Sequence, residues 1–274
     1  MKKLIALLLS LCLVFACSTA ALADRLEDIK AKGKLVVGTE VLYAPFEFYA
    51  TDADGNEYAA GFEMEMVRKI AADLGLEVEL VDQSFASLIT GLRNGDFDMI
   101  VGGFLATDER KQVVDFADPY RQGAQIMVVR EADAEVYTTK ESLKGKIIGA
   151  QVGALQQTIA EEQFPEPEYE HLLLDKVPVL LMDLQAGNID GVLCADLVAK
   201  MYLLKYDGLV ISQVPVEYED VGVSVAIRKS EKDDDNTTLL AAINASIHEA
   251  LDSGEFERWV DEAVAQQAAM SAEE

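Results

Sequence analysis

The residues most suited to ligand chemistry lie in one stretch, Phe97–Tyr120. Gly102 and Gly103 follow an apolar run, and Thr107 begins a T-x-x-R sequence that ends at Arg110. Glycine lets a ligand approach backbone N–H groups closely, because it has no side chain. The planar guanidinium of arginine binds a carboxylate through two parallel hydrogen bonds. This spacing predicts a carboxylate-binding site.

The neighbouring residues indicate how Arg110 is positioned. The apolar residues Phe97–Val101 predict a buried strand, and the hydroxyl of Thr107 is suited to capping a short helix with acidic residues in its first turn. Arg110 then stands a few residues beyond the carboxyl end of the strand. An exposed arginine paired with Glu109 or Asp115 is the alternative, and these residues alone leave both interpretations open.

A second candidate anion site follows another predicted strand. The residues Ile147–Ala150 are apolar, and Gly153 opens a segment with the pattern of a helix that ends near Gln163. The first turn of such a helix presents unpaired N–H groups that bind anions. A plain connection between a strand and a helix is the alternative.

An internal repeat indicates how the chain is organised. The segments 85–103 (FASLITGLRNGDFDMIVGG) and 177–195 (VPVLLMDLQAGNIDGVLCA) align without gaps. The matched pairs include Leu88 with Leu180, Leu92 with Leu184, Gly95 with Gly187 and Asp98 with Asp190. Each segment predicts a helix, a glycine stop and a buried strand, so the chain is expected to form two α/β halves, each with a mostly parallel sheet. Chance recurrence of a common pattern is the alternative.

The chain is expected to end in a helical tail, Thr238–Ala265, that carries Trp259 as a core anchor.

Composition limits the classes of function. The chain has 274 residues, half of them hydrophobic, which is enough for one large domain or two modest ones. Its formal net charge of −26 argues against a nucleic-acid partner, because phosphate binding needs a basic surface. His171 and His248 form no metal-ligand motif, and the sequence contains no P-loop and no Ser-His or Cys-His arrangement. No metal or cofactor is therefore expected.

The N-terminus predicts export. Two lysines precede the apolar run Leu4–Ala16, and a small-x-small sequence ends at Ala23, so residues 1–23 are interpreted as a cleaved signal peptide. Lipidation at Cys17 within a loose lipobox is the alternative. Cleavage after Ala23 leaves Cys194 as the only cysteine, so no internal disulfide is expected. No later stretch is long and apolar enough to cross a membrane.

Several motifs together resemble the polar amino-acid binding proteins of ABC importers. They are, in order, GTEVLYAPFEF, GFEMEMVRKIAADLG, the 85–103 segment with TDER after it, VDFADPY, SLKGKIIGAQVG, LQAGNIDGV and VGVSVAIRK. The resemblance implies a two-lobed α/β fold of the type II periplasmic-binding-protein class, whose lobes are joined by a two-strand hinge. Residues 24–121 and 219–274 would form lobe 1, and residues 122–218 would form lobe 2.

The resemblance also implies roles for individual residues. Arg110 would hold the α-carboxylate of an amino acid, helped by backbone N–H groups around Gly103 and Gly153. Aromatic rings at Tyr43 and Phe85 would enclose the ligand side chain. These roles agree with the carboxylate chemistry predicted from the residues themselves.

The residues that would bind the polar groups of the ligand other than its carboxylate are not fully assigned. An acid at the Glu40 position often reads that end in the family. Leu105 and Leu155 replace hydroxyl residues that the family places near the carboxylate. Ala195 stands where an acid normally binds the α-ammonium, and its neighbour Asp196 either takes that role or is a solvated carboxylate at a helix N-terminus.

The sequence thus predicts an exported, monomeric binding protein on the periplasmic or extracellular face of the membrane. It would capture an amino acid and deliver it to the permease of an ABC importer. Two alternatives use the same fold: a dehydratase of cyclohexadienyl acids, with Glu40 or Asp196 as general acid, and a receptor that feeds a membrane sensor.

Overall fold

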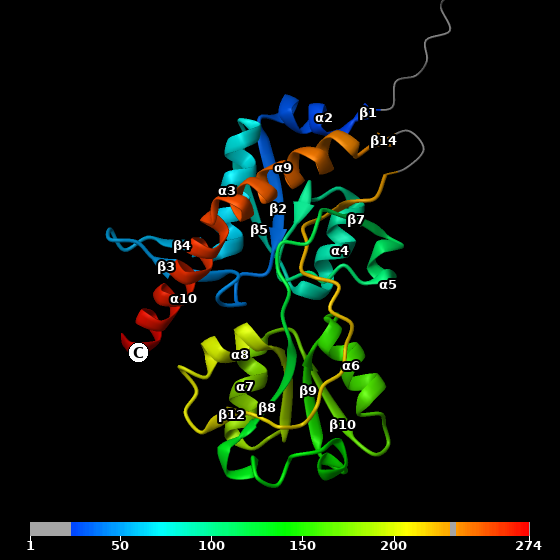
Figure 1. The fold of residues 1–274 in the computed structure, drawn as a ribbon, viewed down its shortest axis with the longest axis vertical. Coiled ribbons are helices and arrows are strands. Elements are labelled where there is room, and N and C mark those ends of the chain that lie inside the picture. Colours follow the sequence, from blue (N-terminus) through cyan, green and yellow to red (C-terminus); the bar gives the residue numbers. More distant parts are fainter. Residues whose placement is uncertain (1–22, 231–233, 274) are drawn as a thin grey trace, which may run out of the picture.

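The protein consists of two α/β lobes that lie end to end (Figure 1). The computed structural model describes residues 23–230 and 234–273. Each lobe contains one five-stranded sheet with helices packed on its faces. The predicted two-lobed fold is confirmed. The predicted signal peptide lies outside the described residues, apart from Ala23.

The strands form two main sheets and two small ones. Lobe 1 contains β2 (Lys34–Thr39), β5 (Glu77–Asp82), β6 (Met99–Ile100), β7 (Val114–Phe116) and β13 (Ala226–Arg228). Lobe 2 contains β8 (Gln125–Arg130), β9 (Ile147–Gln151), β10 (Glu170–Leu174), β11 (Gly191–Ala195) and β12 (Leu209–Ile211). The small sheets pair β3 (Phe48–Thr51) with β4 (Glu57–Ala60), and β1 (Ala23–Asp24) with β14 (Asp234–Asp235).

The helices also divide between the lobes. Lobe 1 carries α2 (Arg25–Lys32), α3 (Phe62–Leu74), α4 (Phe85–Asn94), α5 (Asp108–Lys111), α9 (Thr237–Ser253) and α10 (Glu255–Glu273). Lobe 2 carries α6 (Leu155–Gln163), α7 (Val177–Ala186), α8 (Asp196–Tyr202) and the 3₁₀ helices η1 (Glu131–Asp133) and η2 (Lys140–Leu143). No helix in the described part of the chain is both long and apolar enough to span a membrane.

The two main sheets have the same construction. The strand orders are β5-β2-β6-β13-β7 and β10-β9-β11-β8-β12. In each sheet one strand, β13 or β8, runs antiparallel to both of its neighbours, and the first three strands are parallel. Each reversed strand is the first one that the chain forms after crossing between the lobes. The carboxyl ends of the parallel strands therefore face the other lobe.

The two crossing segments are bonded to each other. The N–H of Ala117 donates to Val225 (2.9 Å), and the N–H of Tyr120 donates to Val223 (2.9 Å). The N–H of Val223 returns a hydrogen bond to the carbonyl of Arg121 at 2.7 Å. The lobes are thus joined by a two-stranded connection. The predicted boundaries near residues 122 and 218 fall in the two crossings and stay a prediction.

The repeat seen in the sequence has the same structure in both lobes. Gly95 and Gly187 end α4 and α7 with φ angles of +84° and +81°. The carboxylate of Asp98 accepts a hydrogen bond from the N–H of Val36 in β2 (2.9 Å), and that of Asp190 accepts one from the N–H of Ile147 in β9 (3.1 Å). Each aspartate thus ties its own strand to the neighbouring parallel strand.

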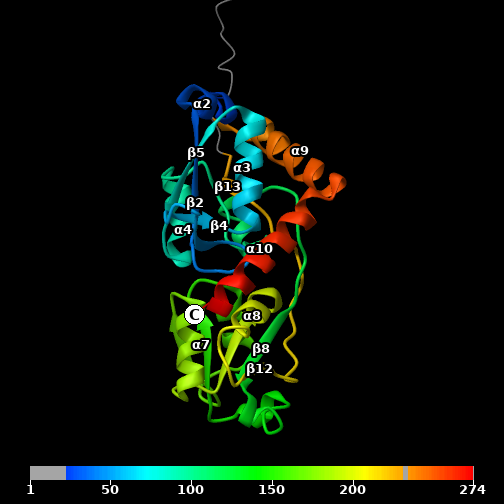
Figure 2. The same cartoon turned by 90° about the vertical axis from the view of Figure 1, so that its left-hand side faces the viewer.

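The C-terminal tail is helical, but it is two helices and not one. Gly254 ends α9 with a φ of +75°, a conformation that favours glycine, and the chain turns there into α10. Trp259 is buried beside Phe256, with ring centroids 6.2 Å apart, as expected for a core anchor. Figure 2 shows α10 running from lobe 1 down to α8 of lobe 2, which it contacts.

Substitution of Gly91 tests the packing of the repeat in lobe 1. A Cβ at this position of α4 would lie 2.5 Å from Cε2 of Phe97, a buried ring next to β6. We expect Gly91→Ala to lower the free energy of unfolding by about 1–3 kcal/mol in urea titrations, because the core has no space for the methyl group. Thr90→Ala, at the exposed neighbouring position, is the control and should change it by less than about 0.5 kcal/mol. Equal stability of the two variants would contradict this packing.

Candidate functional site

A cavity lies between the lobes, at the carboxyl ends of the parallel strands. It encloses about 580 Å³ of space, including the part open to solvent. Its walls come from both lobes and from the crossing segments. They are formed by Tyr43, Phe46, Phe85, Gly102, Gly103, Leu105 and Arg110 of lobe 1, residues 121–124 and Val223 of the crossings, and Gln125, Gln151, Ala154, Leu155, Gln156, Ala195, Asp196 and Leu197 of lobe 2.

Arg110 is the most unusual residue in this cavity. It is only 9% exposed, and its guanidinium donates to two carbonyls, Leu105 in its own lobe (3.1 Å) and Gly153 in the other (3.2 Å). It forms no ion pair within the described residues, so the alternative of an exposed arginine paired with Glu109 or Asp115 is wrong. Burial lowers the pKa of Arg110 to about 10, although nearby Glu109 opposes the shift. The side chain is therefore a charged, desolvated donor at neutral pH.

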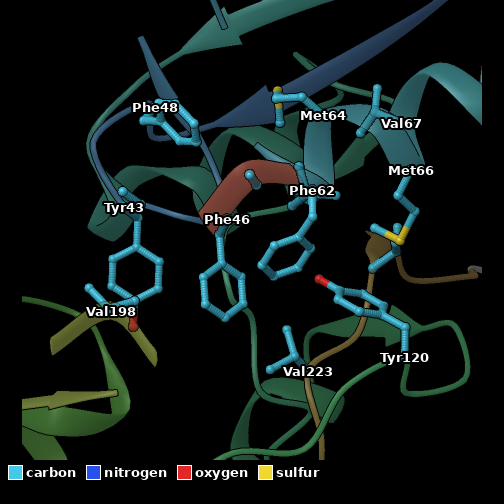
Figure 3. Close-up of a cluster of buried hydrophobic side chains, with 14 of the residues drawn as sticks. Tyr43, Phe46, Phe48, Phe62, Met64, Met66, Val67, Tyr120, Val198 and Val223 are labelled. Carbon is cyan, nitrogen blue, oxygen red and sulfur yellow. The ribbon is translucent and has the colours of Figure 1, made fainter. Parts of the chain in front are cut away.

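Aromatic rings line the same cavity. The guanidinium carbon of Arg110 lies 5.4 Å from the centroid of Phe85 and 5.1 Å from that of Phe104, and these two rings stack at 4.4 Å. Figure 3 shows Tyr43 next to Phe46, whose ring centroid is 5.3 Å away. A Cβ at Gly103, where φ is +65°, would lie 2.9 Å from Cε1 of Tyr43, so glycine is required for this approach.

Both backbone N–H groups that were predicted to assist Arg110 already have partners. The N–H of Gly103 donates to Oε1 of Glu63 at 3.0 Å, and that of Gly153 donates to Oε1 of Gln157 at 2.8 Å. Gly153 does not line the cavity, and it reaches the site through its carbonyl, which accepts from Arg110. A bound carboxylate would therefore have to replace these side chains in order to use the N–H groups.

The two predicted acids differ in position. Asp196 lines the cavity, where its carboxylate accepts from the N–H of Ala124 (3.3 Å) and pairs with Lys200 (2.8 Å). Burial acts to raise the pKa of Asp196, but Lys200 and the Ala124 N–H outweigh it and hold that pKa below its ordinary value. Glu40 does not line the cavity, because it is buried behind Gln151.

Nine residues were predicted to form one site, and Glu40 and Gly153 do not line the cavity. The other seven line it: Tyr43, Phe85, Gly103, Leu105, Arg110, Leu155 and Asp196. Their contacts with a ligand stay a prediction. Phe46 and three glutamines, Gln125, Gln151 and Gln156, also line the cavity and were not predicted. Polar residues at the ends of otherwise apolar strands were the available signal for Gln125 and Gln151, since such positions meet at a cleft in parallel sheets.

Comparison with known proteins identifies the family. The model of the bacterial extracellular solute-binding proteins, family 3, matches residues 35–264. The chain belongs to this family. The resemblance seen in the sequence is thereby confirmed.

Individual relatives of this family 3 protein are named as proteins that bind amino acids. The arginine-binding extracellular protein ArtP of Bacillus subtilis is 32% identical over 259 residues, which cover 94% of this chain and 96% of ArtP. The amino acid ABC transporter substrate-binding protein AbpA of Streptococcus pneumoniae, solved with bound L-arginine, superposes with a TM-score of 0.82 at 31% identity, over 88% of this chain and 99% of AbpA. The ancestral amino-acid-binding protein AncCDT-1, a precursor of cyclohexadienyl dehydratase, gives a TM-score of 0.76 at 25% identity, over 87% of this chain and 99% of its own.

Two further acids of this family 3 protein lie directly behind the glycine pair. Glu47 and Glu63 are fully buried, and their carboxyl groups lie close enough to interact electrostatically. Glu63 also accepts from Tyr120 and from the N–H of Gly103. Burial, followed by the proximity of Glu63, raises the pKa of Glu47 well above its ordinary value, and burial raises that of Glu63. We interpret Glu47 as the acid that keeps its proton in the folded protein, because its pKa is raised by burial and then by the proximity of Glu63.

This pair predicts a specific pH dependence of stability. Because both pKa values are raised in the folded state, folding takes up a proton, and stability falls as the pH rises above the ordinary glutamate value of 4.5. Glu47→Gln keeps a donor towards Glu63 and cannot ionise. The unsubstituted protein loses stability as the pH rises, and Glu47→Gln should lose less. We therefore expect the thermal midpoint of Glu47→Gln minus that of the unsubstituted protein to become more positive from pH 5 to pH 8.

The matched control is Glu162→Gln, which removes one exposed carboxylate from α6. Its midpoint relative to the unsubstituted protein should stay constant over the same pH range. A Glu47→Gln difference that is equally flat would show that the two acids do not share a proton.

Proposed function

We propose that this protein captures an amino acid between its lobes and delivers it to the permease of an ABC importer. The observation that carries the proposal is the burial of Arg110 in the interlobe cavity, where carbonyl oxygens are its only hydrogen-bond acceptors within the described residues. A ligand α-carboxylate supplies the missing negative charge to this guanidinium. The arginine bound to AbpA and the name of ArtP support the assignment of an amino acid as the ligand.

The other cavity residues fit the rest of an amino acid. Tyr43 and Phe85 offer apolar faces to its side chain, and Leu105 and Leu155 exclude water from the carboxylate. Asp196 takes the α-ammonium, since it is the acid that lines the cavity. Glu40 affects the ligand indirectly: it accepts a hydrogen bond from the side-chain amide of Gln151, and Gln151 lines the cavity.

We infer further that the protein does no chemistry on its ligand. Of the two carboxyl groups considered as general acids, Asp196 pairs with Lys200 (2.8 Å), which favours its ionised form. Glu40 pairs with Lys176 (2.8 Å), and burial raises the pKa of Glu40 although the lysine opposes the shift. Glu40 does not line the cavity, and a general acid must lie within hydrogen-bond reach of the ligand. Export with cleavage after Ala23 accompanies this function, and lipidation at Cys17 is the alternative anchor.

A thermal-shift screen of the purified protein against the common amino acids and prephenate tests this function. A ligand at about 100 times its dissociation constant should stabilise the folded state by ~2.7 kcal/mol. We expect a shift with one or a few amino acids and no turnover of prephenate. Turnover of prephenate without any amino-acid shift would favour the dehydratase.

Substitution of Arg110 tests its role as the carboxylate clamp. Each charge-assisted hydrogen bond is worth about 1.5–3 kcal/mol, so Arg110→Met should weaken binding of the amino acid found in the screen by at least about 100-fold in calorimetric titrations. Arg121→Met is the matched control, because Arg121 lines the cavity from a crossing segment and lies 5.9 Å from the ring of Phe62. Equal losses for the two variants would contradict a specific role of Arg110.

A further inference from the structure

Glu40 is held by the opposite lobe. It follows β2 in lobe 1 and is 2% exposed. Its Oε1 lies 2.8 Å from Nζ of Lys176, which precedes α7 in lobe 2, and its Oε2 accepts from Nε2 of Gln151 at 2.5 Å. A lysine and an amide from lobe 2 thus bind one buried carboxylate of lobe 1.

Gln151 lines the cavity and lies between it and the ion pair of Glu40 with Lys176. The side-chain amide of Gln151 donates to Glu40 and to the carbonyl of Asp175 (2.8 Å). Both of its N–H bonds are used, so the amide oxygen is the polar group that Gln151 can offer to a ligand. The charge of Glu40 behind it is balanced by Lys176.

This neutrality has a consequence for charged ligands. A buried carboxylate without a cation would attract the guanidinium or ammonium of a cationic side chain. With Lys176 in place, such a side chain must either displace the lysine or bring a second positive charge to one carboxylate in a poorly solvated site. Both are unfavourable compared with binding of an uncharged polar side chain to the amide oxygen of Gln151.

We propose that Lys176 sets the charge selectivity of the cavity, so that the protein prefers amino acids with uncharged polar side chains to arginine and lysine. This inference rests on the proposed function, in which Arg110 holds the carboxylate and the ligand side chain lies against another wall. The proposed preference distinguishes this chain from relatives that are named for arginine or were solved with bound arginine. The chain nevertheless shares the family and the fold of those relatives.

Lys176→Met tests the proposal, because methionine keeps much of the aliphatic stem and removes the charge. Binding of L-arginine and L-glutamine is measured by calorimetric titration of the purified protein. We expect the unsubstituted protein to bind glutamine more tightly than arginine. In Lys176→Met the ratio of the two dissociation constants should move towards arginine by at least about tenfold, since Glu40 then offers a charge-assisted bond.

The matched control is Lys144→Met. Lys144 is also a lobe 2 lysine in an ion pair, with Glu168 at 2.5 Å, but this pair is exposed and outside the cavity. The variant has the same change in net charge, and its ratio of dissociation constants should stay within about twofold of the unsubstituted protein.

If Lys176→Met does not fold, Glu40→Gln replaces it in the test. This variant leaves Lys176 without its carboxylate, and the ratio for glutamate against glutamine should move towards glutamate by at least about tenfold. Tighter binding of arginine than glutamine by the unsubstituted protein, or an unchanged ratio in the folded variant, would overturn the role of Lys176 while amino-acid binding stands. Absence of binding for every amino acid would overturn the proposed function as well.

Discussion

The guanidinium of Arg110 is a buried positive charge to which the described residues supply only carbonyl oxygens. A carbonyl accepts a hydrogen bond but cannot neutralise a charge, so the site favours an anionic group from outside the protein. The surrounding structure makes this arrangement possible. Phe85 and Phe104 shield the guanidinium, and the carbonyl of Gly153 contacts it only because the lobes lie against each other.

Acids are also buried behind the walls of the cavity, and the protein stabilises them in different ways. Glu40 is paired with Lys176 across the lobes. Glu63 receives hydrogen bonds from Tyr120 and Gly103, and Glu47 is interpreted as keeping its proton. Lys176 neutralises the charge of Glu40 and the retained proton neutralises Glu47, whereas the hydrogen bonds to Glu63 stabilise its carboxyl group without removing a charge. The charge of the cavity is thus set by contacts that lie one layer behind its walls.

The doubled construction explains why these groups meet at one place. In both lobes a helix ends at a glycine, a strand follows, and an aspartate ties that strand to the next parallel strand. The parallel strands of each sheet end towards the other lobe, where polar residues after the strands lie close together. The paired crossing segments allow one chain to build both lobes and return.

The sequence by itself determined the local elements and the family. Glycine stops, apolar periodicity and the gap-free repeat predicted a helix, a glycine stop and a buried strand in each half of an α/β fold, because these features depend on neighbouring residues. Seven of the nine candidate site residues also line the cavity. The sequence missed the break at Gly254, since a glycine within a long apolar pattern is compatible with both one helix and two.

Only the tertiary structure decided which charges meet. Glu40 and Lys176 are far apart in the sequence, and nothing in their local patterns pairs them. The burial of Arg110, the proximity of Glu47 to Glu63 and the occupied N–H group of Gly103 likewise depend on contacts between distant segments. Residue types and spacing determine which groups can bind a ligand. The packing of the lobes determines which of these groups are removed from water. A desolvated charge discriminates strongly between charged and uncharged ligand groups.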